Sequence, residues 1–300
     1  MTVQDARVAI AALQAGQQVD AVFACTRKDR LTTRTGTPYL ALELRDRTGT
    51  VAARAFRDAD VLAGRFDRGD LVRVRGRVDR YRDELQVEVA AIDRVEAPDA
   101  DPSAFLPTAY RDLDELDGFL EHLAGEVSDP GFGGLLAGML GDEVLRAGLR
   151  RSPCTRGGHH AYLGGLLEHT VAVATLAQET CILHVRLDAD LLLTAAIVHD
   201  IGKTREFTYG ADIGLSDEGR LLGHVELGLR MLDERAAKVP ALDDARRLAL
   251  AHCVLTHHGP DASPTRRFAS PEAVALYRIN ALDAAVKGAI EHGPAGPAGA

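Results

Sequence analysis

The sequence contains no long apolar run. No stretch approaches the roughly 20 consecutive apolar residues that a membrane-spanning helix requires, so we expect no membrane contact. The first residues, MTVQDARVAIAALQAG, also lack the positively charged start and the apolar segment of a secretory signal. The expected location is therefore cytoplasmic.

Cysteine is scarce, and its four positions never form a CxxC pair. This spacing argues against a zinc ribbon and against a disulfide framework. It is typical of reduced thiols in a cytosolic protein. The four residues are Cys25, Cys154, Cys181 and Cys253.

Positive charge is not in excess either. The net charge of −9 argues against a protein that coats nucleic acid with its whole surface. The charge is uneven, because residues 16–96 carry +2 and the remainder carries −11. An acidic remainder is compatible with a solvated surface, with metal ligands or with both.

Residues 1–96 have the pattern of a small β-barrel. Five short runs with partial alternation of apolar and polar residues are separated by turn signals. A short helix is predicted at DADVLAGRF, between the third and the fourth run. This is the element order of an OB-fold, so we predict an all-β OB-fold barrel. The five runs are QVDAVFACTR, TPYLALELRD, GTVAARAF, LVRVRGRVDRY and ELQVEVAAIDRV.

The rest of the chain divides into a linker, a helical domain and a tail. Residues 97–110, APDADPSAFLPTAY, contain three prolines and no periodicity, which is typical of an interdomain linker. Over residues 111–292, apolar residues recur at helical spacing and predict an all-α helical bundle. One predicted helix covers residues 133–149. Residues 293–300, GPAGPAGA, are expected to form a flexible, frayed tail.

Histidines are concentrated in the helical half, where nine of the eleven lie between residues 159 and 258. Several occupy apolar helical segments, in which an unpaired ionisable group is costly to bury. A bound cation removes that cost, because neutral imidazole and carboxylate are its natural ligands. We therefore predict a metal centre, with ligand-type residues His169, His199, Asp200, His224, His257, His258 and Asp283.

The adjacent pair His199 and Asp200 is the most informative part of this set. It closes the apolar helix LLLTAAIVHD and is followed by Ile201-Gly202-Lys203. Neighbouring residues at a helix end point roughly 100° apart, so two ligands there can grip a metal from adjacent directions. A carboxylate can also bridge two metals through its two oxygens, which an imidazole cannot.

The order of these residues resembles the HD superfamily of metal-dependent phosphohydrolases, whose signature is H…HD…D. The match consists of His169 in GGLLEHT, His199-Asp200 in HDIGK and Asp283 in NALDAAV. His224, His257 and His258 match the extra ligands of the two-metal subgroup. By this resemblance one divalent ion takes His169, His199, Asp200 and Asp283. The second takes Asp200 as a bridge, with His224, His257 and His258.

The same resemblance implies a mechanism. Water, whose pKa the two ions lower, would attack the phosphodiester. Lys203 would stabilise the negative charge that builds up on the phosphoryl oxygens. Asp200 would hold both ions and orient the nucleophile.

Over residues 16–292 the chain resembles the YhaM-type 3′→5′ exoribonucleases, which join an OB-like domain to an HD domain. The shared motifs are HHAYLGGLLEHT, HDIGK, GRLLGH and LTHHG. The resemblance implies removal of nucleotides from the 3′ ends of single-stranded RNA or DNA, with manganese as the usual metal. Iron, zinc, nickel and cobalt suit the same ligands. His159 and His160 match a histidine pair of the family and would contact the scissile phosphate.

The OB-like half offers candidate nucleic-acid contacts. Arg73, Arg75 and Arg77 alternate and so share one strand face, where their charges repel unless an anion or an acid relieves them. OB-folds usually hold single strands by stacking aromatic rings on bases. The alternative is a solvated arginine face, with the aromatic rings in the barrel core. The candidates for stacking are Tyr39, Tyr81 and Phe23.

Two other functions fit the same residues. An HD phosphohydrolase of small nucleotides would use the OB domain for regulation or for assembly into a homo-oligomer. A catalytically silent single-strand-binding adaptor would need only the OB domain, but the intact ligand set argues against it. Hydrolysis of cyclic dinucleotides is disfavoured, because HHGPDASPT lacks the GYP element of the subgroup that performs it.

Overall fold

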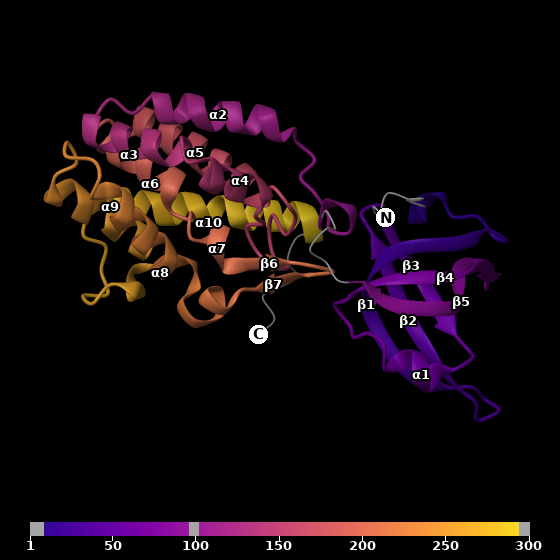
Figure 1. Cartoon of the computed structure of the whole chain (residues 1–300). Coiled ribbons are helices and arrows are strands. Elements are labelled where there is room, and N and C mark those ends of the chain that lie inside the picture. The colour runs from indigo at the N-terminus through magenta and orange to yellow at the C-terminus, as the bar shows by residue number, and fades with distance from the viewer. Residues whose placement is uncertain (1–8, 96–101, 294–300) are drawn as a thin grey trace. The chain divides into compact units, whose positions relative to one another are not determined.

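The computed structural model describes residues 9–95 and 102–293, so part of the predicted linker and residues 294–300 of the predicted tail lie outside it. The chain forms two compact units (Figure 1). The first comprises the chain up to Pro107 together with Thr208–Gly214. The second comprises Thr108–Phe207 and the chain from Leu215 onwards.

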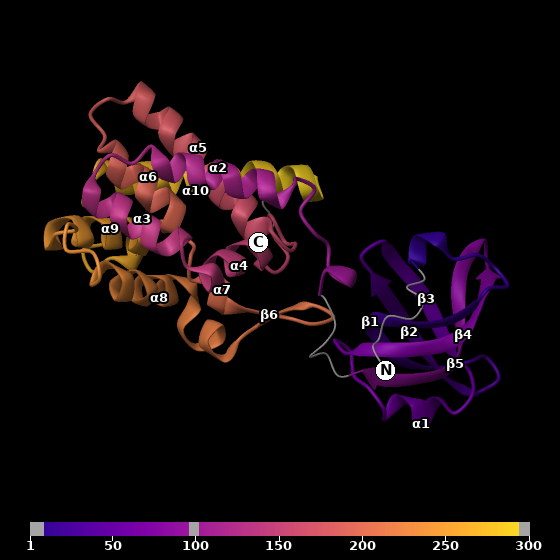
Figure 2. The ribbon, with the colours of Figure 1, turned by 45° about the horizontal axis from the view of Figure 1, so that its top comes forward.

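The first unit is a five-stranded barrel. Its strands are β1 (Gln18–Thr32), β2 (Pro38–Asp46), β3 (Gly49–Ala55), β4 (Leu71–Tyr81) and β5 (Glu84–Val95). They close in the order β1-β2-β3-β5-β4 into the barrel that Figure 2 draws. Neighbouring strands are antiparallel except β3 and β5, which are parallel. The predicted OB-fold barrel is confirmed, and the short helix α1 (Ala59–Ala63) is the exception to its all-β description.

Strand β4 shows why this sequence forms a barrel wall. Its valines, among them Val72 and Val74, are fully buried inside, and the arginines between them point outwards. The alternation is the period of a strand with one buried face. A bulge follows Arg75, and a Cβ at Gly76 would lie only 2.2 Å from the backbone oxygen of Glu88. Glycine therefore permits the close approach of β4 and β5 at this point.

A β-hairpin from the helical half of the sequence completes the first unit. It consists of β6 (Phe207–Tyr209) and β7 (Ile213–Leu215). At its tip, fully buried Ala211 packs in a small cluster with Leu71 and Phe105. Arg45 binds the tip through the backbone oxygen of Ala211 and through Asp212 Oδ1, 2.8 Å from its Nη2. The sequence predicted an all-α half and missed this hairpin.

The second unit is helical. Its helices are α2 (Leu113–Gly125), α3 (Pro130–Leu140), α4 (Glu143–Arg151), α5 (Gly165–Leu183), α6 (Ala189–Val198), α7 (Lys203–Glu206), α8 (Asp217–Ala236), α9 (Asp244–Thr256) and α10 (Pro271–His292). Figure 1 shows α10 running beside α5, α6 and α9, which it contacts. Leu166, Leu192 and Leu276 are fully buried in the core that these helices share.

One predicted helix is divided in the structure. The single helix expected over residues 133–149 ends at Leu140, and α4 begins at Glu143. The division occurs because Asp142 caps α4, accepting hydrogen bonds from the backbone N–H groups of Val144 and Leu145. An N-cap satisfies amides that a continuous helix would already have paired.

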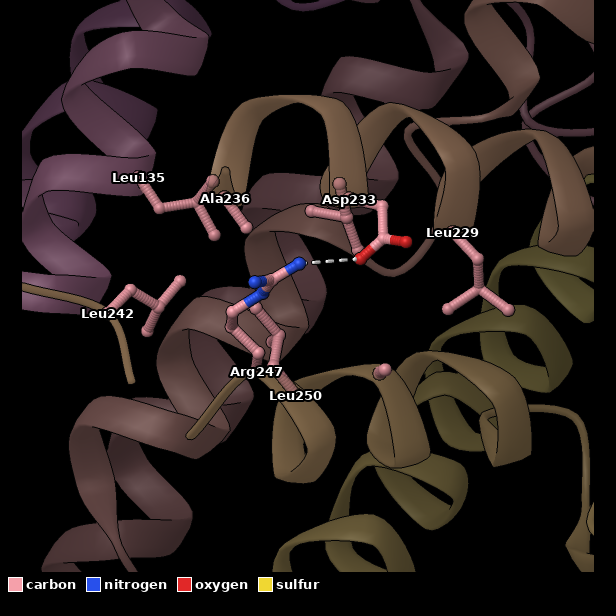
Figure 3. Close-up of a pocket in the computed structure, with 9 residues that line it drawn as sticks. Leu135, Leu229, Asp233, Ala236, Leu242, Arg247 and Leu250 are labelled. Atoms are coloured by element: carbon pink, nitrogen blue, oxygen red, sulfur yellow. Dashed lines mark hydrogen bonds and ion pairs between the residues drawn. The ribbon is translucent and has the colours of Figure 1, made fainter. Parts of the chain in front are cut away.

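A small hollow lies between α8 and α9, where Leu135, Leu242 and Leu250 line it (Figure 3). An ion pair between Arg247 Nη2 and Asp233 Oδ1, 3.1 Å apart, crosses its edge. None of the residues that line the hollow is a predicted metal ligand. No helix in the described part of the chain is long and apolar enough to cross a membrane.

Candidate metal centre

The predicted ligands come from five helices or from the residues that directly follow them. His169 lies in α5, His199 and Asp200 directly follow α6, and His257 directly follows α9. These four residues are at most 1% exposed. His224 lies in α8 immediately after a break in the helix, and Asp283 lies in α10.

Asp200 is the centre of the cluster, because each of its oxygens faces two imidazole nitrogens. Oδ2 lies 3.5 Å from Nε2 of His169 and 3.3 Å from Nε2 of His199. Oδ1 lies 3.4 Å from Nε2 of His224 and 3.4 Å from Nε2 of His257. The carboxylate therefore divides the four histidines into two pairs, one at each oxygen.

His258 extends the second pair. Its Nε2 lies 3.0 Å from Nε2 of His224, and its ring centroid lies 4.0 Å from that of His257. Asp200, His224, His257 and His258 together form one group with metal-ligand spacing. His169, His199 and Asp200 form a second such group.

In each of the four histidines around Asp200, the hydrogen-bond partner of Nδ1 determines which ring nitrogen carries the proton. Nδ1 of His199 donates to the backbone oxygen of Ala196 at 2.8 Å, and Nδ1 of His257 donates to that of Val254. The corresponding partners of His169 and His224 are carboxylates, those of Asp283 and Glu206. A neutral ring that donates from Nδ1 presents an unprotonated Nε2. All four rings therefore direct a lone pair towards Asp200.

Burial favours the neutral form of two of these rings, His169 and His257. It lowers the pKa of His169 to about 4, against an opposing hydrogen bond with Asp283. It also lowers the pKa of His257, although Asp200 beside that ring acts in the opposite direction. Neutral imidazole is the form that binds a metal.

The cluster fits divalent cations. Lone pairs aimed at a buried carboxylate repel it unless a positive charge lies between them. Two of the buried atoms involved, Asp200 Oδ1 and His257 Nε2, have no hydrogen-bond partner among the described residues. Two ligands that each lie about 2.1 Å from one ion are about 3 Å apart, close to the spacing seen here. The donor set and its geometry thus match what a metal requires.

Two glycines, in the motifs HDIGK and GRLLGH, allow the helices that carry the ligands to lie close together. A Cβ at Gly202 would lie 1.9 Å from the backbone oxygen of His224, so any other residue would separate α7 from α8. Gly223 has φ of 71°, in the left-handed region that glycine adopts most readily. It breaks α8 just before His224.

Lys203 and Cys154 lie against Asp200. Lys203 Nζ is 2.6 Å from Asp200 Oδ2 and 3.4 Å from Cys154 Sγ. Burial alone would lower the pKa of Lys203, but the charge of Asp200 outweighs it and raises that pKa. Burial raises the pKa of the Cys154 thiol to about 12, so it stays protonated at neutral pH. His159, half-buried, completes this edge with its Nε2 3.5 Å from Cys154 Sγ.

Asp283 lies on the Nδ1 side of His169, together with His160. Asp283 Oδ2 lies 2.6 Å from Nδ1 of His169 and 3.0 Å from Nε2 of His160. It groups with these two rings and not with His199 and Asp200. His160 is 1% exposed, so its ring is turned into the protein and away from solvent.

The arginine face of the barrel carries its own acids. Arg73 Nε lies 2.7 Å from Asp20 Oδ1, and Arg75 Nη2 lies 3.6 Å from Asp93 Oδ2. Arg77 is opposite Glu88 in the register of β4 and β5. Acids from the same domain therefore relieve the repulsion that would otherwise call for an external anion.

The aromatic candidates divide between the core and the surface. Phe23 is 1% exposed in the barrel core, so its proposed stacking on bases is wrong. Tyr39 is partly exposed and stacks on Phe56, with ring centroids 5.4 Å apart. Tyr81 is 60% exposed, and the Arg82 guanidinium lies 5.3 Å from its ring centroid.

Several residues of the metal centre and of the barrel surface were not predicted from the sequence. Phe56 ends the run GTVAARAF, and its position opposite Tyr39 depends on strand register. Glu206 follows HDIGK by three residues and contacts His224, which a search confined to ligand motifs does not reveal. Glu168 carried a usable signal, because an acid beside His169 on an apolar helix needs a partner when it is buried.

Comparison with known proteins agrees with this architecture. Residues 166–285 match the family model described as HD domain, and residues 25–95 match the one described as OB-fold nucleic acid binding domain. The proteins named "3'-5' exoribonuclease YhaM" of Halalkalibacterium halodurans, Shouchella clausii and Bacillus subtilis are 27%, 29% and 28% identical to the chain. Each alignment covers 90% of this chain and 84%, 85% and 86% of the respective relative. A solved structure, the second OB-fold domain of replication protein A from Methanococcus maripaludis, is 20% identical and covers 30% of this chain and 95% of its own, with a TM-score of 0.25.

The two family matches and the geometry of the metal centre define the class of this protein. The chain joins an OB-fold barrel to a helical HD domain, and an HD domain depends on a divalent metal. Over nearly its whole length the chain is similar to the YhaM-type exoribonucleases.

Proposed function

We propose that the chain is a metal-dependent 3′→5′ exonuclease that releases nucleoside monophosphates from single-stranded RNA or DNA. The names of its relatives support the reaction, and the site supports the chemistry. The observation that carries the proposal is the division of four Nε2 atoms between the two oxygens of buried Asp200. Two cations that share a ligand are a recurrent arrangement in enzymes that cleave phosphodiesters.

The ligand sets follow from this division. One ion would be held by His169, His199 and Asp200, with Asp283 as the remaining predicted ligand. The other would be held by Asp200, His224, His257 and His258. When bound, such ions polarise the phosphodiester and lower the pKa of water. Manganese is the proposed metal, and iron, zinc, nickel and cobalt suit the same mixture of imidazole and carboxylate.

The remaining residues of the site would act on the phosphate. Lys203 is buried with its ammonium fixed beside Asp200, so its charge is pre-oriented for the developing negative charge. His159 is half-buried, and its ring centroid lies 5.5 Å from that of His169. It is the histidine of the pair 159–160 that can donate a hydrogen bond to a phosphate oxygen.

The barrel would hold the strand. Tyr39 and Phe56 form a stacked pair at its surface, and exposed aromatic rings of this kind bind bases without sequence preference. Tyr81 supplies a further exposed ring. The sugar-phosphate backbone of the strand would contact the outward face formed by Arg73, Arg75 and Arg77. Competition from Asp20 and Asp93 weakens that contact.

Product analysis on single strands tests the proposal. One RNA and one DNA of the same sequence are labelled at the 5′ end and, separately, at the 3′ end, and incubated with the manganese-loaded protein. We expect the 5′ label to remain on a ladder of shortening strands, while the 3′ label appears at once in a mononucleotide. Cleavage of free nucleotides alone would support a small-nucleotide phosphohydrolase. Binding without cleavage by fully metal-loaded protein would support the adaptor.

A further inference from the structure

A chain of hydrogen bonds lies behind His169, on the side away from Asp200. Its outer end is Lys287, whose Nζ donates to Glu168 Oε1 at 2.7 Å. The Tyr162 hydroxyl donates to Glu168 Oε2 at 2.9 Å. The Tyr162 oxygen then lies 3.0 Å from Nδ1 of His160. Tyr162, Glu168 and His160 are all buried.

The inner end of this chain reaches the metal centre. Nε2 of His160 lies 3.0 Å from Asp283 Oδ2, and the same oxygen accepts from Nδ1 of His169 at 2.6 Å. Asp283, Lys287 and Glu291 are spaced four residues apart, so they share one face of α10. Through them α10 contacts both His160 and Glu168.

The direction of the hydrogen bonds is fixed at Glu168. Lys287 donates a hydrogen bond to one of its oxygens and the Tyr162 hydroxyl donates to the other. The Tyr162 hydroxyl thus donates to Glu168, and its oxygen lies within hydrogen-bond distance of Nδ1 of His160. Both ring nitrogens of His160 are occupied by protein groups, so neither is available to a substrate phosphate.

The backbone of His160 is held as firmly as its ring. Its φ of 50° lies in the left-handed region, which a residue other than glycine adopts at a cost. Its N–H donates to Glu291 Oε2 at 3.0 Å, and its oxygen accepts from the N–H of Cys154 at 3.0 Å. A Cβ at Gly165 would lie 2.2 Å from that oxygen, so the start of α5 packs directly against it. Three separate contacts thus maintain an unfavourable backbone conformation.

We propose that His160 is a positioning residue that, together with Tyr162 and Glu168, fixes Asp283 and through it the ring of His169. The ring direction matters because it aims Nε2 of His169 at the Oδ2 side of Asp200. The proposal replaces the contact with the scissile phosphate expected for His160, and it rests on the proposed metal centre. Groups behind a ligand usually set its orientation and tune its affinity for the metal.

Metal binding in the absence of nucleic acid tests the proposal. Tyr162→Phe removes one hydroxyl and keeps the packing of the ring. We expect it to weaken manganese binding, measured by calorimetric titration of the metal-free full chain, by about 10-fold or more. Activity should recover at saturating manganese. Tyr110→Phe is the matched control, because Tyr110 is 96% exposed, and it should bind manganese as the unaltered protein does.

His160→Gln separates positioning from phosphate contact. A positioning role predicts weaker manganese binding with little change in KM for the single strand once metal is saturating. A phosphate contact predicts the reverse, with unchanged metal affinity and a raised KM, and that result would overturn the proposal. Unchanged manganese binding by Tyr162→Phe would also overturn it, and this variant decides the question if His160→Gln does not fold. A wrong substrate class leaves these titrations unaffected, whereas an unaltered protein that binds no divalent metal would refute the metal centre itself.

Discussion

At the scale of single residues, the helix ends decide which nitrogen a histidine offers. His199 and His257 each directly follow a helix, and each donates from Nδ1 to the carbonyl three residues earlier. The last carbonyls of a helix lack partners within the helix, so a side-chain donor there satisfies one of them. The same bond leaves Nε2 unprotonated and directed at Asp200. One ring thus caps the helix and would also bind the proposed metal.

Asp200→Asn tests the central carboxylate. The amide has nearly the same shape, but it cannot bridge two cations and leaves the buried Lys203 ammonium without its carboxylate. We expect hydrolysis of a single strand to fall by about 10³-fold or more. Bound metal, measured by elemental analysis, should fall with it. Asp261→Asn is the control, since the Asp261 side chain is 83% exposed. Full metal content with unchanged turnover in Asp200→Asn would remove Asp200 from the site.

The residue types of the centre were predictable from sequence, but their roles were only partly so. The histidines and Asp200 are identified by their order and spacing, which sequence preserves. The partners of Nδ1 are backbone carbonyls or acids distant in sequence, such as Asp283 for His169, and they depend on packing. His160 illustrates the limit, because neighbouring His159 has the same sequence context and differs from it only through the backbone turn.

At the scale of elements, helix positions were largely predictable because long amphipathic segments carry a strong period. The divided helix at Asp142 and the hairpin of β6 and β7 were missed for different reasons. An N-cap inside an apolar segment competes locally with helix continuation. The hairpin strands are three residues each, too short for alternation to be recognised.

Two groups of helices carry the two proposed sets of metal ligands, so we expect the two ions to be removable one at a time. Helices α5 and α6 supply His169 and His199, while α8 and α9 supply His224 and His257. We expect His257→Ala to lower manganese stoichiometry from about two to about one per chain, as should His169→Ala, because each removes a ligand of one set. Combining the two substitutions should leave almost no bound metal.

His252→Ala is the control for this series. His252 lies in α9, and its Nε2 accepts a hydrogen bond from the N–H of Ala269 at 2.9 Å. Its loss should leave the stoichiometry unchanged. If the unaltered protein, saturated with manganese, holds a single ion, the two sets act as one site and the two-ion model fails.

An ion-pair cluster joins α2 to α4. Asp117 is 7% exposed and accepts from Arg146 Nε at 2.8 Å and from Arg150 Nη1 at 2.9 Å. Both arginines are about one-third exposed, so water relieves part of the penalty when the acid is removed. We expect Asp117→Ala to lower the free energy of unfolding by about 2 kcal/mol, between the values of surface and buried pairs. Urea denaturation measures this change.

Asp114→Ala provides the comparison for Asp117. It also pairs with Arg150, but its side chain is 87% exposed. Its removal should lower stability by less than about 1 kcal/mol. Equal effects of the two substitutions would show that burial of Asp117 does not determine the strength of the cluster.

At the scale of the whole molecule, the two compact units are interleaved in sequence. The hairpin tip Thr208–Gly214 belongs to the barrel unit, although it lies between Lys203 and His224 along the chain. Dividing the sequence at a proline-containing linker does not predict that a later segment joins the first unit. That association depends on long-range contacts such as that of Arg45 with Asp212. Removing residues 1–97 would also strip Ala24 and Leu71 from buried Ala211. Point substitutions are therefore a cleaner test of the barrel than truncation.

Replacing Tyr39 and Phe56 by alanine tests whether the barrel captures the strand. The two rings form one stacked, partly exposed pair, and stacking of an aromatic ring on a base contributes about 1–3 kcal/mol. We expect binding of a single-stranded oligonucleotide to weaken by about 10- to 100-fold, because 1.4 kcal/mol corresponds to a factor of ten. The loss should raise KM for long strands and leave kcat on a small phosphodiester unchanged, since no metal ligand is altered.

Two controls give this test its meaning. Tyr110→Ala removes an exposed ring from the helical unit and should change neither binding nor turnover. Triple replacement of Arg73, Arg75 and Arg77 by alanine should reduce the salt dependence of binding only modestly, because Asp20 and Asp93 already pair with two of these arginines. If the Tyr39 and Phe56 variant degrades long single strands as well as the unaltered chain, stacking at this pair does not capture the substrate. A regulatory or assembly role of the barrel would then be the better explanation.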